Sequence, residues 1–399
     1  MATLGVYIQI PFCSSKCSFC NFSSKVAPAK TLEDYLGNLE REIDLLPRAL
    51  GSLNDGAAGK RVSSSFLALP VNSVYLGGGT PTLAGADGLN RIFAALRRQF
   101  LFASVPEVTL EMTPGSADAG LLTVCRQQGI NRLSVGAQSF DDRELRTVGR
   151  LHSGIETVEQ VRLARAAGFE NISIDLIAGL PYQNEASWLR SLRNTLDLAP
   201  EHISVYLFEV DEKSRLGNEV LRHGERFHAS EVPDEDFMAD AYERAQEMFS
   251  DAGYVQYEIS NFARPGFESR HNQKYWRLDP YLGIGAGAHS FDGHSRWANV
   301  ASTDHYAAML AREELPIEEW RTLEPNEQIE EFFFLGLRQQ EGIDIERALK
   351  RFGVSSLEAW QPRVASLLHK GLLETDGGRV RLAPHAYLIS NEVFQEFLD

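Results

Sequence analysis

Apolar runs of strand length alternate with amphipathic stretches of helix length along most of the chain up to residue 252. Runs such as ISIDLIAGL, which starts at Ile172, are apolar enough for strands that are covered on both faces. Parallel neighbours need crossover connections, and helices of this length supply them. The pattern predicts strands over 6–10, 73–76, 107–111, 132–135, 172–177 and 202–208, and helices over 31–46, 87–99, 117–128, 155–167, 185–198 and 235–252.

The alternation stops after these units. The stretch 254–300 is rich in Gly, aromatic residues and His, and we expect it to close one end of the sheet. Residues 50–65 are rich in Gly, Ser and Ala and predict an exposed loop. Near the end of the chain, the pattern predicts helices over 325–338, 344–351 and 356–369, then a hairpin over 372–382 around Asp376-Gly377-Gly378.

These elements predict an α/β fold in two domains. Residues 1–310 would form a partial, open parallel barrel of about six strand–helix units. Residues 311–399 would form a small, mainly helical domain that resembles a winged helix. A chain of 399 residues is long enough to bury a large core without disulfides or a structural metal.

The charge and composition of the chain disfavour several classes of binding partner. The chain has 39 Lys and Arg against 55 Asp and Glu, a net charge of −16, which disfavours nucleic acid and anionic membranes. Residues 325–399 carry 8 basic and 12 acidic side chains, or −4, so the winged-helix-like domain is not expected to bind DNA. No apolar run reaches the roughly 18 residues of a membrane span, and the first residues do not resemble a signal peptide. We therefore expect a cytoplasmic protein without stable membrane insertion.

The strongest chemical signal is a cysteine loop directly after the first strand. Cys13, Cys17 and Cys20 have the spacing C-x3-C-x2-C, while Cys125 lies on a predicted helix far along the chain. Thiolates bind soft metals and iron–sulfur clusters, and a 4Fe–4S cluster held by three of them leaves one iron open to a chelating ligand. Structural zinc with a His as fourth ligand is the alternative, although the second cysteine pair of such sites is lacking.

Five further stretches accompany this loop: GGGTP at 77–81, SVGAQSF at 134–140, IDLIAGLPYQ at 174–183, HNQKYW at 271–276 and GIGAGAHS at 283–290. Taken with the cysteine spacing, they resemble the radical S-adenosylmethionine (SAM) superfamily. Within it they resemble the HemN/HemW branch of coproporphyrinogen III dehydrogenases and haem chaperones. The resemblance runs through most of the chain and implies a 4Fe–4S cluster and SAM as cofactors.

The resemblance also assigns site residues. It implies that Cys13, Cys17 and Cys20 hold the cluster. For SAM, it implies that Tyr7 on the first strand lies near the ligand, that Phe19 packs over the nucleoside and that Glu111 holds the ribose hydroxyls. The backbone of Gly78, Gly79 and Thr80 would receive the methionine amino group. Gln138, Arg150 and Asp175 match contacts for a second SAM or related ligand, and His289 is expected to line the SAM side as well. Most follow strands at their carboxyl ends, where parallel α/β sheets carry active sites. The plainer alternatives are a tight turn at GGGTP and a buried polar network of Gln138, Arg150 and Asp175.

Two departures favour the chaperone side of the branch. The dehydrogenase pattern has another cysteine shortly after the third, where this chain has Phe22. The dehydrogenase also has an N-terminal extension over its substrate, and here the first strand is expected near residue 5. The run HNxxYW resembles the haem-binding stretch of the chaperones, which makes His271 the candidate haem contact. The alternative is a hydrogen-bonded core or surface histidine.

The expected function is therefore that of a haem chaperone that binds haem and delivers it to apo-haemoproteins. Respiratory haemoproteins are among the expected recipients, so peripheral contact with respiratory complexes is compatible with this function. Two alternatives stay open, an oxygen-independent coproporphyrinogen III dehydrogenase and a radical SAM enzyme that acts on RNA. Whether SAM is cleaved reductively is also open at this point.

Overall fold

A sheet of parallel strands curves into a partial barrel, and this part of the prediction is confirmed. The computed structural model describes residues 2–53 and 66–398, so most of the expected loop over 50–65 lies outside the described residues. Six strands lie side by side in chain order, each parallel to the next. They are β1 (Leu4–Ile10), β2 (Val71–Gly78), β3 (Phe102–Met112), β4 (Arg132–Gln138), β5 (Ile172–Ala178) and β6 (His202–Leu207).

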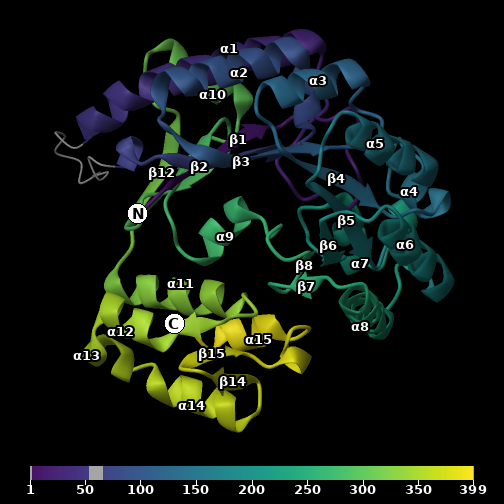
Figure 1. Cartoon of the computed structure of the whole chain (residues 1–399), viewed down its shortest axis with the longest axis vertical. Coiled ribbons are helices and arrows are strands. Elements are labelled where there is room, and N and C mark those ends of the chain that lie inside the picture. The colour runs from purple at the N-terminus through teal and green to yellow at the C-terminus, as the bar shows by residue number, and fades with distance from the viewer. Residues whose placement is uncertain (1, 54–65, 399) are drawn as a thin grey trace.

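Helices cover the outer face of this sheet, as Figure 1 shows. The crossover helices are α1 (Ala29–Leu53), α2 (Gly85–Gln99), α3 (Ala119–Gln127), α5 (Gly154–Ala166), α6 (Glu185–Asp197) and α8 (Glu235–Asp251). Short helical elements that the pattern did not predict are η1 (Phe66–Ala68), η2 (Pro81–Ala84), α4 (Asp142–Thr147), α7 (Arg215–Leu221) and η3 (Arg226–Glu231). Among the described residues, no helix combines the length and apolar character that crossing a membrane requires.

Strand alternation explains why the barrel interior is polar. Ile172, Ile174 and Leu176 of β5 belong to the hydrophobic core. Ser173 and Asp175 lie between them, and successive side chains of a strand point to opposite faces. These two side chains hydrogen-bond to each other at 3.2 Å. The run ISIDLIAGL is thus apolar toward the helices and polar toward the lumen.

The stretch after α8 extends the sheet at both edges. On one side, β8 (Asn261–Ala263) pairs antiparallel with β6, and β7 (Val255–Gln256) follows it. On the other side, β9 (Tyr281–Ile284) pairs parallel with β1. The antiparallel strands β10 (His289–Phe291), β11 (Ser295–Asn299) and β12 (Ile317–Thr322) continue from there. The sheet thus includes residues beyond 310, and the domain boundary placed there stays a prediction.

Two helices belong to this extension. The helix α9 (Arg270–Trp276) connects the two edges and contacts β2 from the inside of the barrel. The helix α10 (Thr303–Ala311) packs beside α1 on the outer face.

The last part of the chain, from Pro325 on, forms a mainly helical unit below the barrel in Figure 1, which we call the C-terminal unit. It contains α11 (Pro325–Leu337), β13 (Ile343–Asp344), α12 (Ile345–Phe352), α13 (Val354–Glu358), α14 (Gln361–His369), β14 (Leu373–Asp376), β15 (Arg379–Leu382), η4 (Pro384–Ala386) and α15 (Ser390–Gln395). Its three short strands pair antiparallel. Helices followed by this hairpin sheet agree with the mainly helical domain that the sequence predicts.

Candidate functional site

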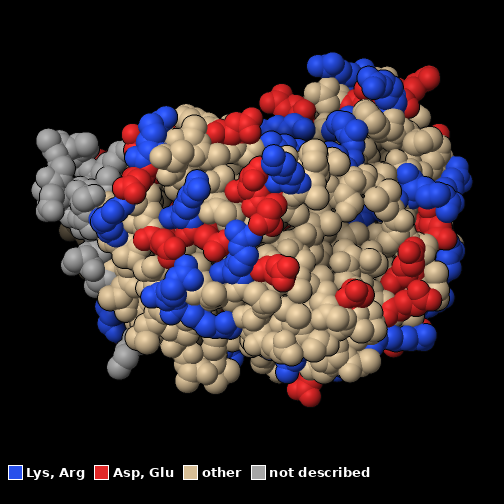
Figure 2. Space-filling view, turned by 90° about the horizontal axis from the view of Figure 1, so that it is seen from above, with Lys and Arg blue, Asp and Glu red and all other residues tan. Residues whose placement is uncertain are grey.

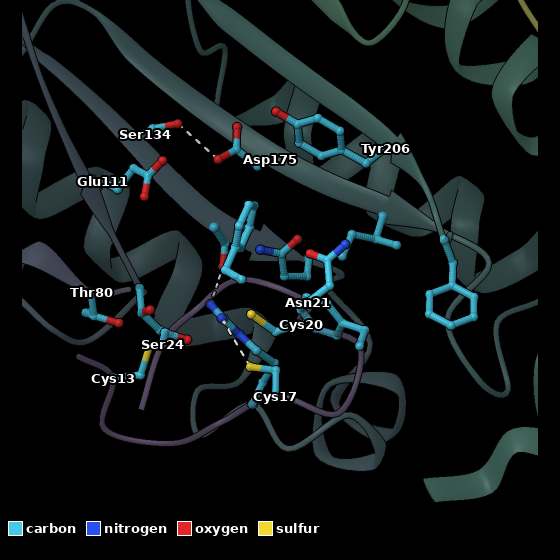
Figure 3. Close-up of a pocket in the computed structure, with 18 of the residues that line it drawn as sticks. Cys13, Cys17, Cys20, Asn21, Ser24, Thr80, Glu111, Ser134, Asp175 and Tyr206 are labelled. Carbon is cyan, nitrogen blue, oxygen red and sulfur yellow. Dashed lines mark hydrogen bonds between the residues drawn. The ribbon is translucent and has the colours of Figure 1, made fainter. Parts of the chain in front are cut away.

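One cavity of about 820 Å³ lies at the carboxyl ends of the parallel strands, as Figure 3 shows. Most of the expected site residues line it. They are Cys13, Cys17, Phe19, Cys20, Gly78, Gly79, Thr80, Glu111, Gln138, Arg150 and Asp175. Tyr7, His271 and His289 are not part of this lining. The fold therefore brings together residues from β1 to β5 that lie far apart in the sequence.

The cysteine loop is fastened to the rest of the barrel at its base and at its tip. At the base, the Cys13 amide donates to the Lys25 carbonyl at 3.0 Å, and the Lys25 amide donates to the Pro11 carbonyl at 2.9 Å. At the tip, the Ser18 amide donates to the Val148 carbonyl at 3.0 Å. The Ser18 carbonyl accepts from the Leu216 amide at 2.8 Å. These bonds hold the loop open toward the cavity.

Each cysteine sulfur has a hydrogen-bond donor beside it. The Lys16 ammonium lies 3.7 Å from Cys20 Sγ. The Arg150 guanidinium lies 3.7 Å from Cys17 Sγ. Burial raises the pKa of the Cys13 thiol, and contacts with the Ser24 and Thr80 hydroxyls oppose that shift. Figure 3 shows these two hydroxyl side chains beside Cys13.

This donor set fits a cofactor that carries negative charge on its sulfurs. Cationic and hydroxyl donors stabilise thiolates, and hydrogen bonds to sulfur tune an iron–sulfur cluster. Among the described residues, no three His, Cys, Asp or Glu side chains converge closely enough to hold a single metal ion. Sequence reasoning missed Lys16 and Ser24. The one signal that could have found Lys16 is its place inside the C-x3-C interval.

The glycine turn after β2 has to be free of side chains. The Gly79 amide donates to the Ile10 carbonyl at 2.9 Å, and the Thr80 amide donates to the Phe12 carbonyl at 2.7 Å. A Cβ on Gly79 would lie 2.4 Å from the Phe12 carbonyl oxygen. Gly78 has a φ of 101°, which L side chains rarely adopt. Close approach of the Phe12 backbone thus explains Gly79, and the positive φ explains Gly78. The two amide hydrogen bonds fix the start of the cysteine loop.

Glu111 is the last residue but one of β3 and lines the cavity. Its carboxylate accepts from the Tyr75 hydroxyl at 2.8 Å and from the Gly78 amide at 3.1 Å. Burial, with a smaller contribution from the nearby Asp175 carboxylate, raises its pKa to about 7 against the effect of the Tyr75 hydrogen bond. This carboxyl group therefore changes charge near neutral pH.

Asp175 on β5 lies on the same side of the sheet as Glu111, with Ser134 of β4 between them, as Figure 3 shows. Its carboxylate accepts from Ser204 at 2.8 Å, Ser134 at 3.0 Å and Ser173 at 3.2 Å. Burial raises its pKa, and these hydroxyls oppose the shift. Serines of β4, β5 and β6 thus hold the Asp175 side chain in place and supply its carboxylate with hydrogen bonds.

Arg150 connects the end of β4 to the cysteine loop. Besides Cys17, its guanidinium donates to the Gly136 carbonyl at 2.5 Å. Gln138 follows a β-bulge in the pairing of β4 with β5 and has a φ of 66°. The bulge turns Gln138 to the same cavity wall as Arg150. The sequence allowed a buried polar network that includes Arg150 and Asp175. In the structure, Arg150 bonds to the cysteine loop and Asp175 bonds to serines.

Three expected residues lie elsewhere. Tyr7 donates to Gln9 Oε1 at 2.6 Å beneath the cavity. His289 is exposed on β10. His271 is buried at 1% exposure, with Nδ1 3.0 Å from the Ser73 hydroxyl and Nε2 2.9 Å from the Tyr275 hydroxyl.

Burial lowers the pKa of His271 to about 3, so its imidazole is neutral at physiological pH. Both ring nitrogens already have hydrogen-bond partners, as in a core histidine. Contact of His271 with haem stays a prediction.

The C-terminal unit also contributes to the cavity, which the sequence did not indicate. Arg338, which directly follows α11, and Tyr387, Leu388, Ser390 and Asn391 line it together with the barrel residues. No local pattern marks these positions, because they reach the cavity only when the C-terminal unit packs against the barrel.

Comparison with known proteins identifies two family models along this chain. A model of the radical SAM superfamily matches residues 7–194, and a model of the HemN C-terminal domain matches residues 323–389. Heme chaperone HemW of Bacillus subtilis (strain 168) is 34% identical over 396 residues, covering 99% of this chain and 99% of that protein. Heme chaperone HemW of Escherichia coli (strain K12) is 28% identical over 400 residues, covering 99% and 98%.

Among solved structures, coproporphyrinogen III oxidase (HemN) from Escherichia coli, described as a radical SAM enzyme, shares this fold. It matches with a TM-score of 0.83 at 23% identity, and the match covers 99% of this chain and 90% of that chain. At this identity the likeness concerns the fold alone.

Proposed function

We propose that this chain, which belongs to the HemW family of the radical SAM superfamily, binds haem and passes it to apo-haemoproteins. The observation that carries the proposal is a cavity onto which three cysteines open, in a chain whose full-length relatives are named heme chaperones. The other cysteine, Cys125, is buried in α3. In the proposed role the protein acts in the cytoplasm, and its recipients include respiratory haemoproteins.

The cavity residues fit a 4Fe–4S cluster and SAM. Cys13, Cys17 and Cys20 would hold the cluster, and Lys16 and Arg150 would stabilise the negative charge on its sulfurs. When bound, the cluster supplies an open iron for a chelating ligand and a source of single electrons.

For SAM, the glycine turn at Gly78–Thr80 allows close approach of a ligand to the backbone. Phe19 supplies an apolar face for a nucleoside. Glu111 offers a carboxylate to the ribose hydroxyls. Gln138, Arg150 and Asp175 remain the proposed contacts for a second SAM or a related ligand.

Haem contact through His271 is part of the proposal. A neutral imidazole is a suitable axial ligand for haem iron, and the low pKa of His271 keeps it neutral. Contact with iron at Nε2 requires the Tyr275 hydroxyl to give up its hydrogen bond. Haem binding at this residue should therefore include a local rearrangement of α9.

The alternatives have different support. The fold likeness to HemN keeps coproporphyrinogen dehydrogenation as a second candidate. Phe22, at the position of that enzyme's additional cysteine, disfavours it and is 67% exposed. For action on RNA, the face in Figure 2 has Lys and Arg interspersed with Asp and Glu rather than gathered in a basic stripe.

The deciding experiment compares two substrates under anaerobic conditions. Reconstituted protein is mixed with ferric haem, and separately with coproporphyrinogen, SAM and a reductant. We expect a stable complex with a shifted Soret band that an apo-haemoprotein then depletes, and no protoporphyrinogen. His271→Ala should weaken that complex, whereas His305→Ala, an exposed histidine on α10, should not. Formation of protoporphyrinogen would contradict the chaperone function.

A further inference from the structure

The cavity extends well beyond the cysteine loop. At about 820 Å³ it lies near the upper end of the range of small-molecule sites, about 300–1,000 Å³. In Figure 3, Tyr206 lies on the far side of the pocket from Cys13 and Cys17. The wall near Tyr206 is formed by aromatic and aliphatic side chains of the barrel and the C-terminal unit, namely Leu207, Tyr242, Ile259, Tyr387 and Leu388. We call this part of the cavity the distal end.

Arg338 is the cationic side chain of the C-terminal unit that lines this cavity. Its Nε donates to Glu258 Oε2 at 2.6 Å, and Nη2 donates to the Ser260 hydroxyl at 3.2 Å. Its guanidinium also lies over the Trp276 ring, 5.8 Å from the centroid.

The Glu258 side chain is fully buried, while that of Arg338 is 32% exposed. Glu258 accepts a hydrogen bond from the Ser260 amide at 2.8 Å and one from the Asn261 side chain. The guanidinium is thus held in one orientation by a fixed carboxylate. Within the described part of the chain, its hydrogen bonds use Nε and Nη2, and Nη1 makes none.

The Lys and Arg side chains that line the rest of the cavity, Lys16 and Arg150, lie beside the cysteine sulfurs. Lys16 donates to Cys20 Sγ, the Phe22 carbonyl at 2.6 Å and the Ser24 hydroxyl at 3.1 Å. Arg150 donates to Cys17 Sγ and the Gly136 carbonyl, and its Nε is buried there without a hydrogen-bond partner among the described residues. Arg338, bonded beside Ile259 at Glu258 and Ser260, is therefore the described lining cation that offers an N–H group at the distal end.

From this geometry we propose that the distal end is the subsite for the tetrapyrrole, where Arg338 Nη1 donates to a propionate carboxylate. The inference rests on the proposed function, because it names where the haem of that function lies. Aromatic and aliphatic walls suit a flat apolar ring, and one fixed guanidinium suits its carboxylate edge. Trp276, beneath Arg338, belongs to the same helix as His271.

The test compares ferric haem with its dimethyl ester, in which the propionates carry no charge. Soret titrations of the reconstituted protein should show haem bound about tenfold or more tightly than the ester, as expected for one charge-assisted hydrogen bond. Arg338→Gln should lose a similar factor for haem and no longer distinguish the two ligands.

The matched control is Arg277→Gln. Arg277 joins α9 to the C-terminal unit through Glu341 at 3.2 Å and Gln339 at 3.3 Å, but does not line the cavity. This variant should keep the preference for haem. If Arg338→Gln is poorly folded because Glu258 is left unpaired, the double variant with Glu258→Gln removes both partners and tests the same contact.

Retained preference for haem in a folded Arg338 variant would overturn this inference and leave the proposed function standing. An equal loss of preference in Arg277→Gln would overturn it as well, since docking of the C-terminal unit would then explain the effect. No binding of either porphyrin by the unaltered chain would overturn the proposed function, and the inference with it.

Discussion

The protonation of Glu111 predicts that nucleoside binding depends on pH. The ionised carboxylate accepts hydrogen bonds from two ribose hydroxyls, which the protonated form does less well. Burial raises the pKa of Glu111 to about 7. About a tenth of the groups are then ionised at pH 6 and about nine tenths at pH 8, so affinity should rise about tenfold over this range. Above pH 8 the affinity should level off.

The assay uses 5′-methylthioadenosine, whose ribose is intact and which lacks the amino group of SAM that titrates near the same pH. Equilibrium binding to the reconstituted protein is measured from pH 6 to pH 8. Glu111→Gln should bind weakly and without pH dependence. Glu156→Gln is the control, because Glu156 also lines the cavity but the Ser153 hydroxyl lowers its pKa. A flat profile in the unaltered chain, or a surviving slope in Glu111→Gln, would refute the reasoning.

Four further predictions rest on the described contacts. Gly79→Ala should reduce iron incorporation and destabilise the fold by about 1–3 kcal/mol because its Cβ meets the Phe12 backbone. Gly37→Ala on α1, whose Cβ would lie at an ordinary contact distance of 3.7 Å from Arg91 Nη2, should stabilise by about 0.5–1 kcal/mol; a denaturant titration measures both glycine variants. Lys16→Met removes a charged donor to a cysteine sulfur and should lower the cluster's reduction potential in a redox titration. Burial raises the pKa of Glu42 from 4.5 to about 7, so the folded state binds this proton more tightly than the unfolded state. As the pH rises from 4.5 to about 7, the chain should therefore lose about 3 kcal/mol of unfolding free energy relative to Glu42→Gln.

The parallel strands could be predicted because each one has a local apolar pattern. Residues 172–177, for example, were expected as a strand and form most of β5. The edge strands had no such signal. β7 and β8 are two and three residues long, and they are strands only because β6 offers an unpaired edge. The helix α7 likewise packs under the cysteine loop through a contact distant in sequence, the Leu216 amide to the Ser18 carbonyl.

The candidate site likewise contains features that the sequence predicted and features that it could not. Cys13, Glu111 and Asp175 were expected from motifs at strand ends, and the barrel places them in one cavity. His271 was singled out by its motif, but its burial depends on Ser73 and Tyr275, and a motif does not show such contacts. The wall that Arg338 contributes depends on how two units pack, and local patterns contain no information about that.

The claim on which the rest depends is that three thiolates in this cavity hold a cluster with one iron open to SAM. The most direct measurement is the Mössbauer spectrum of ⁵⁷Fe-reconstituted protein, recorded with and without SAM. We expect a 4Fe–4S signal in which one iron site changes its parameters when SAM is added. An identical spectrum in both samples, or protein that retains no inorganic sulfide after anaerobic reconstitution, would contradict the claim.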